Sequence, residues 1–535
     1  MNKKTETSKT HSVPDVVVAG AGSGSLVAAA YLATAGLNVL VLERNKWVGG
    51  GVHTAEVTAP GFRHDLCSTA HLILQGNPVI LNDEIGLQSK FGLKYIRPEV
   101  TFASVYDDDT ALLTYFDLDK TCESMARISA RDAETYRRFV EKNRPTIRLM
   151  MAGMFQPPAP FGSFMALLEQ SKEGRDLIGV LNRSAYDLIG SLFENAKIQN
   201  HFMKYAAESM SGPEEKGTGL IFNMICGIVH AFHGGMPVGG SGGLADALVR
   251  CIEHHGGTVR TEADVVRVIM EGGRAQGVVL ADGEEIRARR AVIGCFHPHL
   301  LGRYVSGLDP QLIADAKGTE HGTYSAINTH YALNESPKYR ALEGLPPAFI
   351  MELLPADQEE FRRSFDEPRY NRLSKHPSMV CITATDFDST RAPAGKATLY
   401  KYAFAPYNLD NRGAARWDEV KEETADWMLA YYRRFTTNMG PENIIARYVE
   451  SPLDIERNSL SFLRGDISGI GRYLHQLLGR RPIPELGQYA VPGAEGLYLA
   501  GPFQHPGGGV NGGGRAVAIR IMKDLGLDFD KTIVR

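Results

Sequence analysis

DVVVAGAGSGS at residues 15–25 decides the fold, and LVAAAYLATAG at 26–36 and NVLVLE at 38–43 continue it. The β-branched run at 15–19 predicts a parallel strand that is buried on both faces, and residues 38–42 predict a second one. The small apolar residues between them predict a helix that ends at Gly36. These elements form one βαβ unit, so the sequence indicates an α/β fold with a Rossmann-type dinucleotide-binding domain.

The turn after the first strand carries a glycine fingerprint. Gly20 and Gly22 fill its first two positions, where they turn the chain tightly and let a pyrophosphate approach the backbone. Ser25 stands at the third position and is small enough for helix and strand to pack. Glu43 ends the second strand, where an acidic side chain accepts hydrogen bonds from ribose hydroxyls and repels a 2′-phosphate. FAD and NAD share this unit, so the fingerprint alone does not separate them.

Composition narrows the function classes. The 535 residues predict two or more structural units, and a formal net charge of -4 gives no reason to expect a nucleic-acid partner. The six cysteines are scattered, without a CxxC pair or zinc spacing, which argues against a dithiol centre or a structural metal. We expect each of them to be a small buried apolar residue.

The N-terminal residues MNKKTETSKTHSVP lack the apolar stretch of a signal peptide, so a cytoplasmic location is the default expectation. The longest apolar segment, at 220–232, is broken by Asn223 and His230 and is too short to span a bilayer. We interpret it as a buried segment, with a peripheral membrane-facing patch as the alternative.

The remaining patterns predict the order of elements. Helical patterns, for example at 132–142 and 164–181, indicate a mainly helical insertion over 77–231. A helix from Gly242 and short strands at 258–261, 264–270, 275–280, 285–289 and 291–295 follow it. Strands at 378–385 and 398–404, flanked by helices at 417–436 and 466–478, predict a second sheet. A strand at 496–500, a glycine-rich turn and a helix at 510–525 end the chain.

The residues after Glu43 point to a family. LERNKWVGGGVHT at 42–54 contains three consecutive glycines, which let backbone lie against a flat or charged group. From here the sequence resembles the FAD-dependent phytoene desaturase and carotenoid oxidoreductase family (pyridine nucleotide-disulfide oxidoreductase domain 2-like), within the glutathione-reductase and amine-oxidase superfamily. The resemblance recurs in family order at PGFRHDLCST (60–69), MPVGGSGGLADAL (236–248), DFDSTRAPAGKATLYKYAFAPY (386–407), RGDISG (464–469) and GLYLAGPFQHPGGGVNGGG (496–514).

The resemblance implies FAD as the cofactor and a discontinuous FAD-binding domain at 12–76, 235–300 and 486–535. Residues 77–234 and 301–485 then form a mixed α+β substrate-binding domain with a helical cap. Val265 is expected to offer its backbone to the adenine, Gly501 to lie by the ribityl chain, and the amides of Val510 and Asn511 to open the last helix toward the flavin. The whole expected cofactor set is Gly20, Gly22, Ser25, Glu43, Arg44, Gly49, Gly50, Gly51, Val265, Gly501, Val510 and Asn511.

The expected reaction is dehydrogenation (desaturation) of a C–C bond in an apolar small molecule, such as an isoprenoid or an alicyclic ketone or acid. No second glycine turn offers a nicotinamide site, so electrons are expected to pass to oxygen, a quinone or another acceptor. Two alternatives stay open: a redox-neutral flavin-dependent isomerase, and a binding protein of the GDP-dissociation-inhibitor type. The oligomeric state is left open.

His505, in the last glycine-rich turn, is the candidate catalytic residue, although a histidine before proline is often structural. His53, His64, Asp65 and His233 are weaker candidates because they flank glycine segments. Arg515 is expected to pair with a carbonyl or carboxylate as readily as to touch substrate. Tyr400, Tyr402, Phe404 and Tyr407 fit core packing, with one face of their strand open to a substrate cavity as the alternative.

Overall fold

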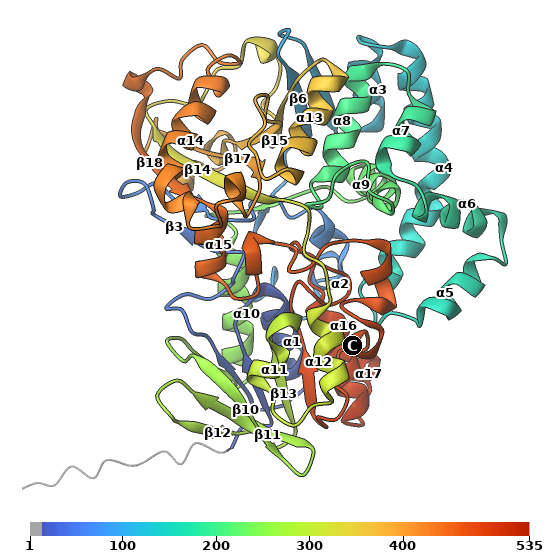
Figure 1. Cartoon of the computed structure of the whole chain (residues 1–535), viewed down its shortest axis with the longest axis vertical. Coiled ribbons are helices and arrows are strands. Elements are labelled where there is room, and N and C mark those ends of the chain that lie inside the picture. The colour runs from blue at the N-terminus through green and yellow to red at the C-terminus, as the bar shows by residue number, and fades with distance from the viewer. Residues whose placement is uncertain (1–12, 534–535) are drawn as a thin grey trace, which may run out of the picture.

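Figure 1 shows the computed structural model of the chain, which describes residues 13–533. The segment up to residue 12, for which we expect no signal peptide, lies outside the described residues. A five-stranded parallel sheet in the order β19-β13-β1-β2-β9 occupies the lower half of the molecule. Its strands are β1 (Val16–Ala19), β2 (Val39–Leu42), β9 (Thr258–Arg260), β13 (Ala291–Gly294) and β19 (Leu497–Leu499). The expected α/β fold with a discontinuous Rossmann-type sheet is confirmed.

Helices and strands cover opposite faces of this sheet because side chains alternate along β1. Val16 and Val18 pack with α1 (Ser23–Thr34), α10 (Gly242–His254) and α16 (Gly514–Asp524). Val17 and Ala19 pack with an antiparallel sheet of β10 (Val265–Glu271), β11 (Arg274–Leu280) and β12 (Glu285–Arg287). The apolar run of β1 is therefore explained by burial on both faces.

The helix α1 is enclosed, since α10 and α16 both pack beside it and residues 25–33 are buried. Its approach to α16 is a contact of backbone with backbone. A Cβ added at Gly514 would lie 2.0 Å from the carbonyl oxygen of Gly24 and 2.6 Å from the amide of Ala28. The last helix of the chain is thus fixed against the first.

A mixed seven-stranded sheet in the order β18-β14-β17-β16-β15-β6-β7 forms the upper half (Figure 1). Its strands are β6 (Val100–Tyr106), β7 (Ala111–Tyr115), β14 (Ser325–Leu333), β15 (Ile350–Leu354), β16 (Met379–Ile382), β17 (Ala397–Ala405) and β18 (Ile444–Glu450). We expected the region 77–231 to be mainly helical, and β6 and β7 correct that expectation. They form because β6 pairs in parallel with β15, a partner far along the chain.

Seven helices form the cap beside the second sheet, on the right of Figure 1. They are α3 (Leu118–Ala126), α4 (Ala130–Met154), α5 (Phe161–Leu168), α6 (Lys172–Leu181), α7 (Ala185–Leu192), α8 (Ala196–Ala207) and α9 (Thr218–Ala231). The expected single helix at 164–181 is two helices, because the Ser171 side chain accepts the amide of Gly174 and starts α6. The apolar segment at 220–232 is α9, most of which is buried.

The outer face of the second sheet is covered by α14 (Arg416–Tyr432), whose Trp417 is fully buried. The remaining elements pack locally: α13 (Gln358–Arg369) lies on α8 and β17, α15 (Pro452–Asn458) on β14 and β18, and α17 (Phe529–Ile533) on α16. Two short strand pairs complete the fold, β3 (Thr54–Ala55) with β4 (His64–Asp65) and β5 (Tyr95–Ile96) with β8 (Met236–Pro237).

Two segments pack differently from the expected domain division. Apolar residues between 79 and 93, which begin in α2 (Pro78–Leu81), join the core beneath the parallel sheet. Residues 301–316, with α11 (Leu301–Tyr304) and α12 (Pro310–Lys317), pack on β10 to β12. We assigned both segments to the substrate domain, whereas their apolar side chains are buried against the dinucleotide domain.

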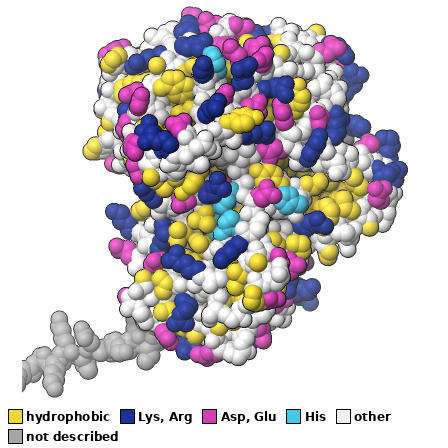
Figure 2. Space-filling view, viewed as in Figure 1, with side chains coloured by type: hydrophobic (Ala, Val, Ile, Leu, Met, Phe, Trp, Pro, Cys, Tyr) yellow, Lys and Arg dark blue, Asp and Glu magenta, His cyan; other side chains and the backbone are white. Residues whose placement is uncertain are grey.

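The surface carries both signs of charge. Lys and Arg are interspersed with Asp and Glu over the face in Figure 2. Apolar side chains gather toward its right-hand edge, where Figure 1 places α5 and α6, and Leu149 and Leu167 are 69% and 59% exposed. Within residues 13–533 no helix is long and apolar enough to cross a membrane. A peripheral membrane contact stays a prediction.

The contact of α1 with α16 predicts the effect of one methyl group. We expect Gly514→Ala to lower the free energy of unfolding by about 1–3 kcal/mol, since the added carbon overlaps backbone that cannot rotate away. The measurement is the thermal midpoint followed by near-ultraviolet circular dichroism. Gly179→Ala is the matched control, because this helical glycine has nothing within 4 Å of an added Cβ. Equal midpoints for the two variants would contradict the close packing.

Candidate active site

One cavity of about 430 Å³ lies between the two halves and reaches both sheets. At one end its wall is the glycine turn after β1, the end of β2 and the start of β10. At the other end its wall is the inner face of the second sheet together with α8 and α9. Apolar side chains dominate this second end: Phe102, Ile221, Met224, Ile225, Ile228, Val229, Ile350, Val380 and Ile382. The cavity therefore joins a dinucleotide-type turn to an apolar pocket.

The glycine turn is held open by backbone geometry that other residues do not tolerate. Gly20 has φ +103°, and a Cβ there would lie 2.8 Å from the Cβ of Cys295. The amide of Gly49 donates to the carbonyl of Ala21 at 2.8 Å, so the glycine run lies against the turn. The chain thus presents bare backbone to the cavity along both segments.

Glu43 lies at the same edge of the cavity and is nearly buried. Its carboxylate accepts the amide of Ala21 at 2.8 Å and that of Asn45 at 2.9 Å. These two bonds fix the direction of the carboxylate, and each of its oxygens keeps a further lone pair for an incoming hydroxyl. Arg44, which follows it, also lines the cavity and donates to the carbonyl of Arg457 at 2.8 Å.

The residues around this end fit a flavin dinucleotide. A Cβ at Gly22 or Gly24 would meet nothing closer than 3.9 Å, so space lies open beside the turn. Buried polar atoms of two residues that line the cavity have no hydrogen-bond partner among the described residues: Arg472 Nε, and Gln504 Oε1 and Nε2. Buried polar groups are rarely left unpaired, so this arrangement indicates a polar ligand.

The structure brings all twelve expected cofactor residues to one region. All but Gly49 line the cavity, and Gly49 supports its wall from behind. One expectation is wrong: Val510 and Asn511 do not open the last helix, because α16 begins at Gly514. Asn511 instead clamps the turn, where its side chain donates to the carbonyl of Gly507 at 2.7 Å and accepts the amide of Gly513 at 2.8 Å.

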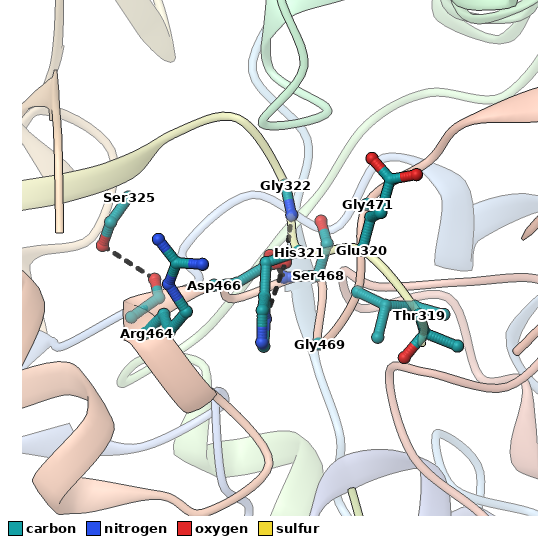
Figure 3. A network of polar contacts seen from close by, with 12 residues as sticks. Thr319, Glu320, His321, Gly322, Ser325, Arg464, Asp466, Ser468, Gly469 and Gly471 are labelled. Atoms are coloured by element: carbon teal, nitrogen blue, oxygen red, sulfur yellow. Dashed lines mark hydrogen bonds and ion pairs between the residues drawn. The ribbon is translucent and has the colours of Figure 1, made fainter. Parts of the chain in front are cut away.

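A buried aspartate shapes the loop below this turn. In Figure 3, Asp466 accepts the amide of Gly322 at 2.6 Å and that of Ser468 at 2.8 Å. The helix expected at 466–478 does not form, because Gly469 adopts φ +76° and the amide of Gly471 donates to the distant carbonyl of Glu320 at 2.8 Å rather than within a helix. The loop leads to Arg472, whose Nη2 donates to the carbonyl of Gly508 at 2.5 Å. A guanidinium is thereby placed against the glycine-rich turn.

The candidate acid–base residues separate into two groups. His505 and His53 line the cavity, and burial lowers the pKa of His505 to about 4, so its imidazole is neutral near pH 7. His64 and His233 do not line the cavity. His64 bonds to the hydroxyl of Thr58, and His233 bonds to the carbonyl of Pro98.

Two further candidates have structural roles. Asp65 forms a buried ion pair with Arg391 at 3.0 Å. Arg515 donates two hydrogen bonds to the carboxylate of Glu84, at 2.8 and 2.9 Å. Pairing with a carboxylate is one of the two roles expected for it.

The cysteines differ in part from expectation. Four are buried, whereas Cys67 and Cys295 are partly accessible and line the cavity. Burial raises the pKa of Cys67 to about 12, so its thiol keeps its proton and is a poor nucleophile. Within residues 13–533 no group of three His, Cys, Asp or Glu side chains is placed to hold a metal ion.

The inner face of the second sheet carries a row of six side chains, all of them polar except Val380. The strand register aligns one residue from each of six strands in this order: Ser104, Glu352, Val380, Tyr402, Asn328 and Glu450. Tyr400 and Tyr402 line the cavity, as expected if one face of their strand is open to it. Phe404 and Tyr407 do not line it. Sequence reasoning missed Glu208, Asn328 and Glu450, which also line the cavity.

Two carboxyl groups of this row are buried deeply enough to favour their neutral forms. Burial raises the pKa of Glu352 to about 8, and Oε1 of this residue has no partner among the described residues. Burial also raises the pKa of Glu450 to about 7, while its Oε1 accepts a hydrogen bond from the side-chain Nδ2 of Asn458 at 2.9 Å. Glu352 is therefore protonated at neutral pH and Glu450 at pH below about 7, and of the two only Glu450 lines the cavity.

This fold and cavity define a dinucleotide-binding enzyme with a separate substrate domain. Residues 24–363 match the model of the flavin containing amine oxidoreductase family, and the chain therefore belongs to that family. The chain is similar to a limonene dehydrogenase component from Castellaniella defragrans, with 28% identity over 96% of this chain and 95% of that protein. It is equally similar, at 28% identity over 96% and 94%, to the pyridine nucleotide-disulfide oxidoreductase domain-containing protein 2 of Rattus norvegicus.

Among solved structures, the chain shares its fold with an oxidoreductase from Methanosarcina mazei, with a TM-score of 0.61 and 17% identity over 96% of this chain and 99% of that chain. The expected family resemblance is confirmed, and the protein is a flavin-dependent oxidoreductase.

Glu352 predicts a pH dependence of stability. Its pKa in the folded protein lies above that of an exposed glutamate, so its contribution is complete below about pH 4.5 and is lost as the pH rises through about 8. Each pH unit in this window costs up to about 1.4 kcal/mol. We expect Glu352→Gln, which mimics the protonated acid, to flatten the fall in thermal midpoint between pH 5.5 and 8.5. Parallel curves for the variant and the wild type would contradict this.

Proposed function

We propose that this protein is an FAD-dependent dehydrogenase that desaturates a C–C bond of a largely apolar small molecule. The observation that carries the proposal is the single cavity that joins the dinucleotide-binding turn to the apolar pocket. The limonene dehydrogenase component from Castellaniella defragrans supports a dehydrogenation, because it is a dehydrogenase by name and aligns over nearly the whole chain.

The residues at the first end of the cavity are suited to hold FAD. Glu43 is positioned to accept the ribose hydroxyls, the turn at Gly20 and Gly22 to receive the pyrophosphate, and the backbone of Val265 to meet the adenine. Arg472 and the turn at 507–509 place positive charge and amides at the other part of the cofactor site. When bound, FAD supplies hydride acceptance from a substrate C–H bond.

The second end of the cavity serves to position the substrate. Its aliphatic side chains come from two opposite surfaces, the sheet and α9, and they exclude water from the space between. Orientation by shape is the main requirement when a hydride leaves an unactivated C–H bond. His505 presents a neutral imidazole at the junction of the two ends, where it can donate or accept one hydrogen bond.

A redox-neutral isomerisation on the same fold is the second candidate, since the same cavity would serve it. Formation of stoichiometric hydrogen peroxide or reduced quinone with product speaks for dehydrogenation. The electron acceptor and a cytoplasmic location stay predictions. A binding protein of the GDP-dissociation-inhibitor type is disfavoured by the unpaired polar atoms around the cofactor end of the cavity.

Glu43→Arg tests the cofactor. We expect the purified variant to lose flavin absorbance near 450 nm while its thermal unfolding stays cooperative, because a guanidinium cannot accept the ribose hydroxyls. Glu253→Arg, an exposed site on α10, is the matched control and should keep its FAD. A colourless wild-type protein that gains no flavin absorbance when FAD is added would contradict the proposal.

His505→Ala tests the junction of the cavity. We expect the variant to retain FAD and to slow anaerobic bleaching of the flavin by substrate by about 10²-fold, as for loss of one aligned polar group near reacting atoms. Stopped-flow absorbance gives the rate, and His233→Ala provides a control outside the cavity. Unchanged bleaching in His505→Ala would assign this histidine a structural role only.

A further inference from the structure

Three side chains form a connected polar group in the wall of the apolar pocket. The Lys204 ammonium pairs with one oxygen of the Glu208 carboxylate, and the Tyr402 hydroxyl donates to the other. Lys204 and Glu208 come from the C-terminal end of α8 and the residue after it, whereas Tyr402 comes from the middle of β17. Lys204 is fully buried, while Tyr402 and Glu208 line the cavity. Burying polar and charged groups costs free energy, and a cavity that binds only a hydrocarbon gains no interaction from them.

The direction of the hydrogen bonds decides what Tyr402 offers the cavity. A phenol has one proton to donate, and Tyr402 donates it to Glu208. Burial and the neighbouring carboxylate both raise the pKa of Tyr402 well above its ordinary value, so the phenol stays protonated. Its oxygen keeps lone pairs that can accept a hydrogen bond. Tyr402 therefore presents an acceptor, and the matching ligand group is a donor.

Charge decides between the two common donors, a neutral hydroxyl and a protonated amine. Lys204 already pairs with Glu208, and its ammonium lies 4.5 Å from the centre of the Phe404 ring on the same strand as Tyr402. The second acid near it, Glu352, is held in its neutral form by burial at pH below about 8. No unpaired negative charge among the described residues therefore attracts a cation at this point, and the buried ammonium repels one.

The rest of the polar row supports a neutral ligand. Asn328 lies beside Tyr402 in the register, and its Oδ1 accepts the Tyr400 hydroxyl at 3.4 Å. Glu450 is the remaining acid of the row that lines the cavity, and burial raises its pKa to about 7. Its Oε2 lies 4.0 Å from Nε2 of His330. At pH below about 7 these groups therefore bring little net charge to the pocket.

We infer that the substrate carries a neutral hydroxyl group on its apolar skeleton, which donates a hydrogen bond to the Tyr402 oxygen, with Lys204 and Glu208 holding that oxygen as an acceptor and disfavouring amines. The inference rests on the proposed function, because it takes the cavity as the substrate site. It makes Tyr402 a specificity-determining residue and Lys204 a positioning residue.

The test uses the FAD-loaded protein and three ligands with one skeleton: butylcyclohexane, 4-butylcyclohexanol and 4-butylcyclohexylamine. Binding is measured by the perturbation of the flavin absorbance spectrum at pH 6, where Glu450 is mostly protonated, without turnover. We expect the alcohol to bind about tenfold more tightly than the hydrocarbon and the amine, as for one well-formed hydrogen bond in a dry pocket. Tyr402→Phe should reduce the preference of alcohol over hydrocarbon to about twofold or less.

Tyr205→Phe is the matched control. Tyr205 also lines the cavity, but its hydroxyl donates to Thr114 at 2.8 Å, so the preference for the alcohol should persist. Lys204→Met provides a second readout, since removal of the ammonium leaves Glu208 unpaired. We expect the amine to bind about tenfold more tightly to Lys204→Met than to the wild type. Flavin content and circular dichroism show that each variant is folded.

Three results would overturn the inference: equal affinity of the wild type for alcohol and hydrocarbon, a preference for the amine in the wild type, or a preserved alcohol preference in Tyr402→Phe. Failure of the proposed function has a different signature, which is absence of bound FAD. A protein that binds FAD and binds the hydrocarbon as tightly as the alcohol keeps the proposed function and loses this inference.

Discussion

The contact between α1 and α16 is the constraint on which the site depends. The helices approach until the backbone at Gly514 meets the carbonyl of Gly24, and no side chain fits between them. This contact joins the two ends of the chain, so the turn at 501–513 lies over the turn at 20–25. The cofactor end of the cavity exists only because these turns face each other. Its wall is mostly backbone, and the few side chains in it, such as Glu43, are held by amides.

The substrate end is built on another principle. Strand register, rather than backbone contact, brings six side chains from distant segments into one row across the sheet. A buried ammonium, Lys204, is tolerated there because Glu208 pairs with it and the Phe404 ring faces it. The ion pair and the ring contact therefore offset the free-energy cost of removing the ammonium from water, and the surrounding wall stays apolar.

The local elements could be predicted from the sequence and the distant pairings could not. The unit from β1 to β2 follows from β-branched runs and a glycine turn within thirty consecutive residues, which are all local signals. In contrast, β6 forms on β15, and no local pattern names that partner. The helix expected at 466–478 does not form because Gly469 is left-handed and the Gly471 amide pairs with the distant carbonyl of Glu320, which periodicity does not report.

The same division holds for the site. Apart from Val265, which the family resemblance supplied, each expected cofactor residue lies in or beside a glycine motif and reaches the cavity or supports its wall. In contrast, Glu208 carries no motif at the end of α8. The alternation of Tyr400, Tyr402 and Phe404 indicated a strand face but not which of the three would meet the cavity. That choice depends on where the cap lies over the sheet. Side chains that act through tertiary contact alone leave no signal in a single sequence.

These two kinds of wall explain how a family can keep its cofactor and change its substrate. A substitution at Gly20 or Gly514 meets backbone or a fixed Cβ within 2.8 Å, so the cofactor end resists change. A substitution at Val380 or Tyr402 alters the chemistry of the pocket while the strand stays paired to its neighbours. At 28% identity two proteins can share the residues of the cofactor end and differ in the residues of the substrate pocket. The substrate of this protein is therefore to be inferred from its own polar row, in which a tyrosine oxygen, held by an ion pair, faces an apolar pocket.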